Sequence, residues 1–254
     1  SLLTGGGGNA NYWHWLYDVL PKLELCRNFF DLNKIDFFLL PGLEKKFQRE
    51  SLDFLKIPSN KRISSKKYRH IKAKELIITD HPVVTTGNAT KDIENIPDWI
   101  ISWLKDNFLS SVKTTNKKNR IYIDRNDETS NSLQERSIIN EEEIKKYLIK
   151  NNFLVVKLHN IHFLEQVNLF HNAECIAGLH GGGFGNITFC EPGTKIIELK
   201  SLTAGNAIKN LAEKNKLNYN SIAAEDKESK KNDFPKQQGS IHIPLNRLSK
   251  ILES

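Results

Sequence analysis

The chain contains no methionine and only three cysteines among its 254 residues. Cys26, Cys175 and Cys190 lie in apolar stretches without Cys-x-x-Cys spacing, so we expect buried, reduced thiols rather than a disulfide or a zinc site. No apolar run approaches the roughly 20 residues of a membrane-spanning helix, and no secretory signal peptide opens the sequence. Because the first residue is not methionine, we expect the natural N-terminus to lie upstream.

Several motifs of nucleotide and acyl chemistry are missing as well. The sequence has no Gly-x-x-x-x-Gly-Lys-Ser/Thr loop, which argues against a P-loop hydrolase, and no Gly-x-Ser-x-Gly elbow. It has no Gly-x-Gly-x-x-Gly, since Asn186 stands at the third glycine position after Gly181 and Gly183. It lacks a closely spaced Asp-x-Asp pair for a divalent ion, and His159 and His162 have no third ligand nearby in the sequence. We therefore expect no metal.

Acidic residues are outnumbered by basic ones. The chain has 37 Lys and Arg against 30 Asp and Glu, a net charge of +7, and part of the excess lies in two clusters, residues 66–74 and 113–120. Such clusters can bind nucleic acid, anionic lipid or a phosphorylated substrate, or can be solvated loops. Neither cluster alternates with aromatic residues like a base-stacking surface, so we expect no nucleic-acid partner.

Apolar periodicity predicts strands that alternate with helices along the chain. Strands are expected at residues 36–40, 76–79, 120–124, 153–158, 175–179, 196–199 and 219–223. Helices are expected at residues 11–20, 44–55, 97–108, 140–150, 163–171, 206–214 and from 245 onward. Alternation of this kind predicts an α/β fold with parallel sheets covered on both faces.

The polar, basic segment 110–119 has no apolar period, and we place a domain boundary there. The sequence thus predicts an N-terminal lobe at 1–110, incomplete at its start, and a C-terminal lobe at 111–254. Two such lobes are expected to leave a cleft, in which ligands bind at the carboxyl ends of the strands. In the second lobe, Asn140 is expected to cap a helix, with Glu143 in a capping-box position.

The most informative pattern lies at residues 175–199. A short apolar run ends in His180 and is followed by Gly181, Gly182 and Gly183, before a Pro-Gly turn and a second apolar run. Strand, glycine loop, helix start and strand is the order in which an α/β sheet presents backbone N–H groups to an anion. We therefore predict a phosphate-type site at this loop. The alternative is a mobile loop without a ligand.

His14 lies in an aromatic stretch just after a run of glycines. On a helix, His14 and Asp18 are four residues apart and share a face. A carboxylate beside an imidazole fixes its tautomer and raises its basicity, as a general base requires. The alternative is a core histidine whose hydrogen bonds are satisfied by a nearby acid.

Arg125 and Arg136 bracket a polar segment that follows an expected strand. Guanidinium groups bind phosphate oxygens bidentately and can neutralise the charge that develops on a diphosphate leaving group. Surface ion pairs are the alternative for these arginines. Glu198 closes the next strand, where a carboxylate can accept hydrogen bonds from a ribose diol or can simply face solvent.

Three blocks of the sequence resemble glycosyltransferase family 61, which includes protein O-linked GlcNAc transferases, plant cell-wall xylosyl- and arabinosyltransferases, and bacterial capsule enzymes. The blocks are NYWHWLYDVLPKL, IYIDRNDETSNSLQERSIINEEE and FLEQVNLFHNAECIAGLHGGGFGNITFCEPGTKIIEL. They are similar to the family's aromatic-His block, its Tyr-Ile-x-Arg block, and its His-Gly-Ala-Gly block that continues to Pro-Gly-Thr-x-Val-Ile-Glu. Two positions differ: Gly182 stands where Ala is usual, and Asp124 where Ser often precedes the arginine.

The resemblance implies a GT-B fold, with two Rossmann-like lobes around a donor cleft and a C-terminal lobe that binds the nucleotide-sugar. It implies that the glycine loop from His180 and the side chain of Asn186 hold the nucleotide diphosphate. Arg125 and Arg136 are then expected to counter the charge of the diphosphate. Glu198 is expected to hold the ribose or a neighbouring loop.

In the N-terminal, acceptor-side lobe, the resemblance implies that His14, oriented by Asp18, deprotonates an acceptor hydroxyl for inverting transfer. We expect a nucleotide-sugar donor, a UDP-sugar first of all, a saccharide or lipid-linked saccharide acceptor, and no further cofactor or metal. The Lys-, Asn- and Ile-rich composition and the reduced cysteines suggest surface-polysaccharide synthesis in a bacterial cytoplasm, with peripheral contact at the inner face of the membrane. The alternatives are a non-catalytic nucleotide-sugar or polysaccharide-binding protein and a basic nucleic-acid-associated protein.

Overall fold

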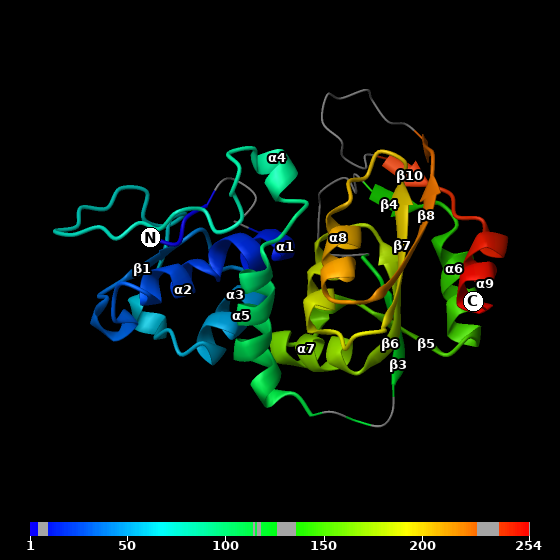
Figure 1. Ribbon diagram of the computed structural model, residues 1–254, viewed down its shortest axis with the longest axis horizontal. Coiled ribbons are helices and arrows are strands. Elements are labelled where there is room, and N and C mark those ends of the chain that lie inside the picture. Colours follow the sequence, from blue (N-terminus) through cyan, green and yellow to red (C-terminus); the bar gives the residue numbers. More distant parts are fainter. Residues whose placement is uncertain (5–9, 114, 116–117, 126–135, 228–238, 254) are drawn as a thin grey trace. The chain divides into compact units, whose positions relative to one another are not determined.

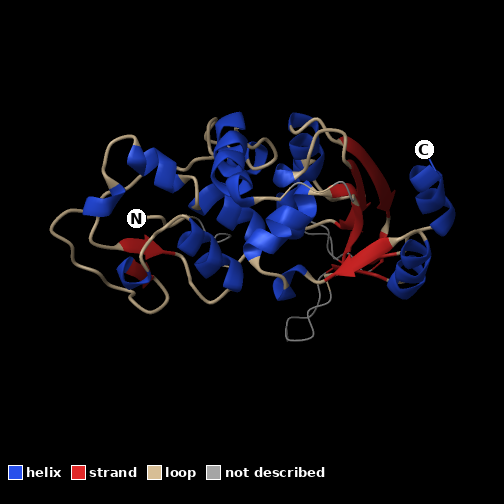
Figure 2. Cartoon of the chain, turned by 90° about the horizontal axis from the view of Figure 1, so that it is seen from below, coloured by secondary structure: helices blue, strands red, loops and turns tan. Residues whose placement is uncertain are grey.

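The computed structural model describes residues 1–4, 10–113, 115, 118–125, 136–227 and 239–253. The chain forms two compact units, which we call unit 1 (Ser1–Val112 and His162–Val167) and unit 2 (Lys113–Ile161 and Asn168–Ser254). Figure 1 labels the helices and strands, and Figure 2 distinguishes strands, helices and loops by colour. Each unit has a parallel sheet of its own.

A five-stranded parallel sheet forms the centre of unit 2. In spatial order its strands are β5 (Phe153–Val156), β3 (Asn119–Ile123), β6 (Ala173–Leu179), β7 (Lys195–Ser201) and β8 (Asn218–Ala224). The central strands are nearly continuous apolar runs; in β6 every residue after Glu174 is buried. Strands of parallel sheets have this composition because helices cover both faces. The structure confirms the predicted α/β class with parallel sheets.

The strand order of this sheet reverses between β3 and β6. From β3 the chain crosses to β5 on one side, and then returns past β3 to form β6, β7 and β8 on the other side. In open α/β sheets, ligands bind outside the carboxyl ends of the strands at such a switch point. The segments that leave this point begin at Asp124 and His180, directly after β3 and β6.

Helices cover both faces of the sheet, as Figure 1 shows. α6 (Glu141–Lys150) and α9 (Leu245–Glu253) pack on one face, and α8 (Ala207–Lys214) lies on the other. Because successive side chains of a strand point to opposite faces, alternate strand residues meet α6 and α9. The buried residues that this five-stranded sheet contributes to the core cluster are Tyr122, Phe153, Cys175, Ala177, Leu179, Ile197, Leu199 and Ile222.

The remaining elements of unit 2 are short. A second sheet pairs β4 (Arg136–Ile138) in parallel with β10 (Gly239–Ile241), and β10 in antiparallel with β9 (Asp226–Lys227). Strands of two or three residues are too short for an apolar period, so the sequence pattern misses all three. Between β5 and β6 lie a 3-10 turn (Leu158–Asn160) and α7 (Phe163–His171), of which the residues up to Val167 belong to unit 1. The 3-10 helix Gly182–Phe189 follows β6.

Unit 1 consists mainly of short helices beside a two-stranded parallel sheet, β1 (Phe38–Leu40) and β2 (Arg62–Ser64). Its helices and turns are α1 (Tyr12–His14), the π-helical turn Trp15–Val19, α2 (Lys22–Arg27), the 3-10 turns Leu32–Lys34, Ser59–Lys61 and Leu109–Ser111, α3 (Lys46–Phe54), α4 (Ala89–Asp92) and α5 (Asp98–Phe108). Aromatic rings fill its core. The ring centroids of Tyr12 and Phe47 are 5.0 Å apart, and those of Phe108 and Phe163 are 4.9 Å apart.

The predicted strand at residues 76–79 is wrong. This segment is irregular, and the side chains of Leu76 and Ile78 are exposed. The carbonyl of Ile77 accepts a hydrogen bond from the N-terminal ammonium group of Ser1, at 2.5 Å, and no strand pairs with it within the described residues. A short apolar run is therefore not sufficient for a strand when no sheet edge is available to it.

The predicted capping box at Asn140 is also wrong. The Asn140 side chain accepts no hydrogen bond from a backbone N–H of the first turn of α6, although its amide donates to Oε2 of Glu143 at 3.1 Å. Its amide instead donates to the carbonyl of Ile243 at 2.9 Å, and its oxygen accepts from the N–H of Ile243 at 3.0 Å. The side chain of Asn140 thus bonds the backbone before α9. This tertiary contact joins residues 103 positions apart, so the local sequence does not predict it.

Candidate active site

At the switch point of unit 2, Gly181 lies against the guanidinium group of Arg125. A Cβ atom at position 181 would lie 3.0 Å from Cζ and Nη1 of Arg125, closer than side chains normally approach. Arg125 also donates a hydrogen bond from Nη1 to the carbonyl of His180, at 2.7 Å. The structure thus brings a cation from the end of β3 directly beside the glycine loop that follows β6.

Arg125 has a second arginine as an electrostatic neighbour. Its side chain meets solvent, but partial desolvation of the guanidinium group and the charge of Arg136, at the start of β4, lower the pKa of Arg125 to about 10, against the opposite effect of Glu141. Arg125 therefore remains a cation at neutral pH. Two cations that repel each other favour an anion between them, because the anion relieves the repulsion.

The glycine loop offers backbone N–H groups next to these cations. The first hydrogen bond of the 3-10 helix runs from the N–H of Phe184 to the carbonyl of Gly181, at 3.1 Å. The N–H groups of Gly182 and Gly183 precede it and have no acceptor among the described residues. Unpaired N–H groups at the start of a helix are suited to bind an anion.

Asn186 shapes this loop from within the protein. Its side chain is fully buried, and its amide donates to the carbonyl of Gly183 at 3.4 Å. A Cβ atom at position 183 would lie 3.0 Å from Cδ1 of Leu158, so glycine is also the residue that fits there without a shift of that leucine. The side chain of Asn186 therefore supports the glycine loop by bonding the backbone of that loop.

A buried carboxylate holds His180, the first residue of the loop. Glu198 of β7 is fully buried; one of its oxygens bonds Nδ1 of His180, and the other accepts a hydrogen bond from the hydroxyl of Tyr219 in β8. Nζ of Lys200 lies 3.9 Å from Oε2 of Glu198. Desolvation and the charge of Glu198 raise the pKa of Tyr219, so its hydroxyl keeps the proton that it donates. These contacts make Glu198 a support for His180.

In unit 1, His14 and Asp18 form a close pair, with Nδ1 of His14 2.6 Å from Oδ2 of Asp18. His14 ends α1, and Asp18 lies in the π-helical turn, whose bond from Leu20 N–H to the Trp15 carbonyl measures 3.1 Å. We assign the Nδ1 proton of His14 to this contact, since a carboxylate only accepts; Nε2 is then left as the basic nitrogen. Insertions that widen a helix in this way are frequent at functional sites.

A second histidine, His81, shares Asp18. Nε2 of His81 lies 3.9 Å from Oδ2 of Asp18, which is too long for a direct hydrogen bond but close enough for an electrostatic contact. Nδ1 of His81 accepts from the N–H groups of Val83 and Val84, each at 3.3 Å, so the proton of the neutral ring is on Nε2 and faces the carboxylate. Sequence reasoning missed His81, because it lies in an irregular segment 63 residues from Asp18.

The same cluster contains a buried cation and two polar atoms without a partner. Lys22 is buried, its Nζ lies 3.5 Å from the carbonyl of Thr79, and desolvation lowers its pKa against the charges of Asp18 and Asp80. Among the described residues, the buried atoms Oδ1 of Asp18 and Oγ1 of Thr79 make no hydrogen bond. Buried polar groups are rarely left unpaired, so these two oxygens can still accept a hydrogen bond from water or from a polar ligand.

The residues proposed from the sequence therefore form two groups. Unit 2 brings together Arg125, His180 and Gly181, with Arg136 as electrostatic neighbour and Asn186 and Glu198 as internal supports. Unit 1 brings together His14 and Asp18. The polar stretch between Arg125 and Arg136, residues 126–135, lies outside the described residues.

No group of three or more His, Cys, Asp or Glu side chains that could hold a metal ion occurs in the described part of the chain, and His159 is exposed while His162 lies 3.7 Å from Glu50. Among the helices formed by the described residues, none has the length and apolar character needed to cross a bilayer.

In unit 2, two arginines, free helix amides and a glycine loop gather at the switch point of the parallel sheet of an α/β protein. The family model described as Glycosyltransferase 61 matches residues 12–197, more than half of the chain, and the chain belongs to this family. Membership implies glycosyltransferase activity, with a sugar donor and an acceptor as substrates. No curated protein matches the chain significantly.

Proposed function

We propose that the protein is an inverting glycosyltransferase that moves a sugar from a nucleotide-sugar, a UDP-sugar first of all, to a hydroxyl of a saccharide or lipid-linked saccharide. In this proposal the fold is of the GT-B type, in which residues 111–254 bind the donor and residues 1–110 bind the acceptor. The observation that carries the proposal is the contact of the Arg125 guanidinium group with Gly181 and with the carbonyl of His180, at the switch point of the sheet.

The diphosphate of the donor would lie against the glycine loop. The free N–H groups of Gly182 and Gly183 donate to its oxygens, and Arg125 and Arg136 balance its charge. During transfer, the negative charge grows on the departing diphosphate, and fixed cations and N–H groups stabilise that charge more than they stabilise the ground state. His180, anchored by Glu198, closes one side of this site.

His14 is proposed as the general base. Its Nε2 removes the proton from the acceptor hydroxyl while the hydroxyl oxygen forms a bond to the anomeric carbon. The bond from that carbon to the diphosphate oxygen breaks in the same step, so the configuration inverts and the electron pair leaves with the diphosphate. Asp18 stabilises the imidazolium that results, through its contact with Nδ1 at 2.6 Å.

We further propose that the enzyme needs no metal or cofactor, because arginines and helix amides can supply the charge stabilisation on their own. The proposed setting is surface-polysaccharide synthesis in a bacterial cytoplasm, with peripheral contact at the inner face of the membrane. The basic residues 66–74 support that contact, since anionic lipid attracts clustered Lys and Arg.

A thermal-shift panel of UDP-, GDP-, CMP- and dTDP-sugars tests the donor site, because a ligand that binds only the folded state raises the melting temperature. We expect the UDP-sugars to give the largest shift, and Arg125→Ala to abolish it. Arg247→Ala is the control, since Arg247 is an exposed arginine of unit 2 on α9. If no nucleotide-sugar shifts the wild type, or if Arg125→Ala leaves the shift unchanged, the donor site is wrong.

A protein that only binds nucleotide-sugars would give the same thermal shift. Slow hydrolysis of the donor separates the two functions, since a transferase releases some free sugar in the absence of acceptor and a binding protein releases none. We expect hydrolysis by the wild type and its loss in His14→Ala with the thermal shift retained.

A further inference from the structure

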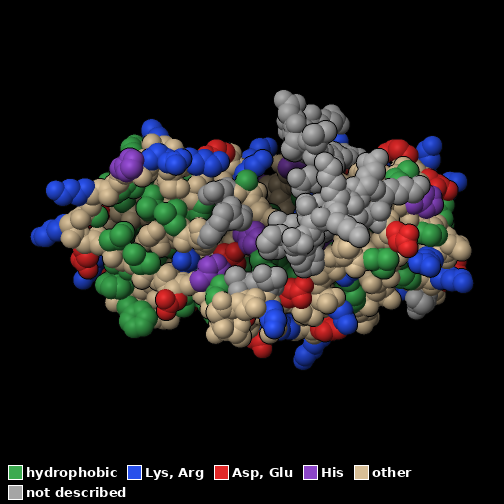
Figure 3. All heavy atoms as spheres, turned by 90° about the horizontal axis from the view of Figure 1, so that it is seen from above, with side chains coloured by type: hydrophobic (Ala, Val, Ile, Leu, Met, Phe, Trp, Pro, Cys, Tyr) green, Lys and Arg blue, Asp and Glu red, His purple; other side chains and the backbone are tan. Residues whose placement is uncertain are grey.

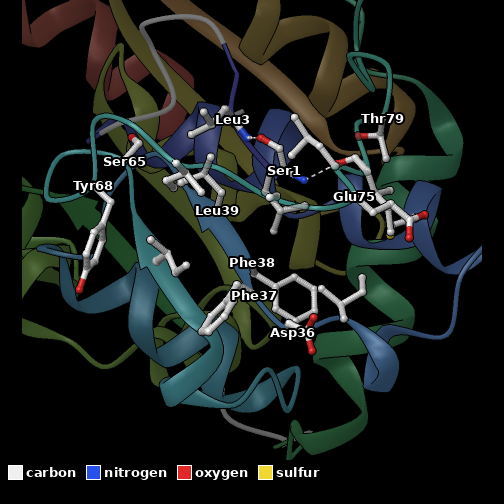
Figure 4. Close-up of a pocket in the computed structure, with 18 of the residues that line it drawn as sticks. Ser1, Leu3, Asp36, Phe37, Phe38, Leu39, Ser65, Tyr68, Glu75 and Thr79 are labelled. Carbon is white, nitrogen blue, oxygen red and sulfur yellow. Dashed lines mark hydrogen bonds between the residues drawn. The ribbon is translucent and has the colours of Figure 1, made fainter.

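Unit 1 contains a cavity of about 1280 Å³ that the proposed transfer reaction does not use. It lies between the N-terminal residues 1–3, strand β1 with the loop before it, and the irregular segment 65–79 (Figure 4). In Figure 4, Tyr68 stands on one side of the cavity, Phe37 and Phe38 line its floor, and Glu75 and Thr79 lie on the other side. Pockets for small molecules typically measure about 300–1,000 Å³, so this one has room for a long ligand.

Large apolar side chains line this cavity and are nevertheless exposed to solvent. They come from three separate stretches of unit 1 and converge on one hollow: Leu3, Phe30, Phe37, Tyr68, Ile71 and Leu76. Single exposed apolar side chains are ordinary, but a contiguous group in a concave surface marks a place where an apolar partner binds.

Cations without an ionic partner stand among these apolar groups. Lys34, Arg69, Lys72 and Lys74 line the cavity, and none of them forms an ion pair within the described part of the chain. By contrast, Lys66, which also lines it, lies 3.4 Å from Glu44. The left-hand part of Figure 3, which is unit 1, shows Lys and Arg side chains next to one another beside a field of hydrophobic side chains.

Carboxylates at the cavity do not balance these cations. Asp31, Asp36 and Glu75 line it, three carboxylates against the four cations without an ion pair, and Asp31 also caps the 3-10 turn Leu32–Lys34. Apolar and basic residues follow one another along residues 68–76, so one chain segment supplies both the apolar wall and the free cations. A ligand that fits both the apolar wall and the cations must have a long apolar part and an anionic group at one end.

We propose that this cavity binds a single long-chain lipid phosphate, with its hydrocarbon chain inside and its phosphate at Arg69, Lys72 and Lys74. A nucleic acid fits less well, since Tyr68 is the one aromatic residue among the basic residues of this segment. The site extends the proposed function, because it gives a lipid-linked acceptor a place for its lipid. Only this role in acceptor binding rests on the proposed function; the binding of a lipid phosphate does not.

Calorimetric titration with farnesyl phosphate, at concentrations below its aggregation, tests the site directly. Farnesol has the chain without the charge, and inorganic phosphate has the charge without the chain. We expect one farnesyl phosphate per chain, at least tenfold weaker binding of farnesol, and no binding of phosphate alone. Equal binding of farnesol and farnesyl phosphate, or no binding of either, would overturn the proposal.

Paired variants separate the apolar wall from the cations. Ile71→Asp with Leu76→Asp should abolish the binding of farnesyl phosphate, and Lys72→Glu with Lys74→Glu should weaken it at least tenfold. The matched controls lie in unit 2 at exposed positions: Ile149→Asp with Leu154→Asp, and Lys146→Glu with Lys150→Glu. Melting curves confirm that each variant folds. Equal weakening by the controls would contradict a site in the cavity.

Cys26 gives a readout confined to the cavity, because it lines the cavity and is the sole cysteine of unit 1. Farnesyl phosphate should slow the alkylation of Cys26 by N-ethylmaleimide, and should leave the alkylation rates of Cys175 and Cys190 in unit 2 unchanged. Peptide mass spectrometry measures the rate at each cysteine. If all three cysteines are protected alike, or none is, the ligand does not occupy the cavity and the proposal fails.

Two other partners of this surface, a membrane and a second copy of the chain, would give different results. Binding to phosphatidylglycerol vesicles without binding of monomeric farnesyl phosphate would indicate a surface contact and overturn the cavity. A dimer in sedimentation experiments that protects Cys26 and excludes farnesyl phosphate would indicate a second copy of the chain, and would overturn it as well. Hydrolysis of the sugar donor is measured in parallel: its absence in the wild type removes the proposed function, and leaves a positive lipid titration standing.

Discussion

Unit 2 holds its proposed donor residues at the ends of strands, whereas unit 1 holds its proposed base on a short helix and a π-helical turn. In unit 2 the neighbours Arg125 and His180 leave adjacent parallel strands, so the sheet register fixes their approach. In unit 1, Asp18 meets His14 through local helical spacing and meets His81 through an irregular segment. A site built on a sheet is therefore more fully determined by the fold than one assembled from a turn and a loop.

Removal of the proposed base should give the largest effect and would break this comparison most directly. His14→Ala should lower the rate of transfer about 100- to 10,000-fold, the usual contribution of a general base, while the thermal shift by the donor is kept. Steady-state kinetics with the donor found in the panel measure the change. A transfer rate equal to that of the wild type would show that unit 1 does not supply the base.

Loss of the cation beside the glycine loop should have the next largest effect. Arg125→Ala should lower kcat/KM about 100- to 1,000-fold, because one preorganised group that stabilises developing charge is removed. Gly181→Ala should reproduce part of this loss, since its Cβ would lie 3.0 Å from the same guanidinium group. Lys209→Ala is the control, because Lys209 is exposed on α8, where its ammonium group lies 3.8 Å from Glu213. A full rate in Gly181→Ala would contradict the tight contact.

The contacts of buried Glu198 with His180 and Tyr219 should show their effect in stability. Tyr219→Phe removes one donor to a fully buried carboxylate, and we expect a loss of about 1–3 kcal/mol in the free energy of unfolding. Urea denaturation measures it. Tyr147→Phe on α6 is the control, since the Tyr147 hydroxyl bonds no group within the described residues. Equal stability of wild type and Tyr219→Phe would show that Glu198 does not need this donor.

His81 should make the stability of unit 1 depend on pH, the smallest of these effects. Desolvation, followed by the charges of Lys22 and His14, lowers the pKa of His81 against the effect of Asp18. The unfolded chain therefore binds more protons below about pH 6.5, and the contribution of neutral His81 is lost as the pH falls from there toward its lowered pKa.

His81→Gln removes this titration while it keeps a donor near the position of Nε2. Urea denaturation at pH 7.5 and pH 5.5 should show a smaller loss of stability at the lower pH in His81→Gln than in the wild type. His70→Gln is the control, because His70 is exposed in the same segment. The same pH dependence in wild type and His81→Gln would mean that His81 titrates as it does in the unfolded chain.

The parts of the fold that the sequence predicts well are those with a strong apolar period. The predicted segments 175–179, 196–199 and 219–223 are strands, and 153–158 is a strand as far as Val156, because their apolar runs are long enough to fill a covered parallel sheet. The prediction of a strand at residues 76–79 is wrong, because this exposed apolar run has no neighbouring strand to pair with among the described residues. The family is confirmed as well, because its model matches residues 12–197, the range over which the three blocks lie.

Within the site, neighbours that are close in sequence could be predicted and those that tertiary packing supplies could not. The pair of His14 and Asp18 follows from helical spacing. His81 and Tyr219 lie 63 and 21 positions from the carboxylates that they face, in segments with no motif, and only the folded backbone brings them there. The place of Arg125 beside Gly181 depends on the pairing of β3 with β6, which apolar patterns do not specify.

The buried Glu198 has a consequence for how the chain can change in evolution. Its two oxygens are committed to an imidazole and a phenol from neighbouring segments, with no water-accessible surface to accept a replacement. Loss of His180 or Tyr219 leaves one oxygen of this buried carboxylate without its partner. Relatives that have lost one of these residues should therefore have exchanged the other two, and such linked replacements would be the inherited trace of this contact.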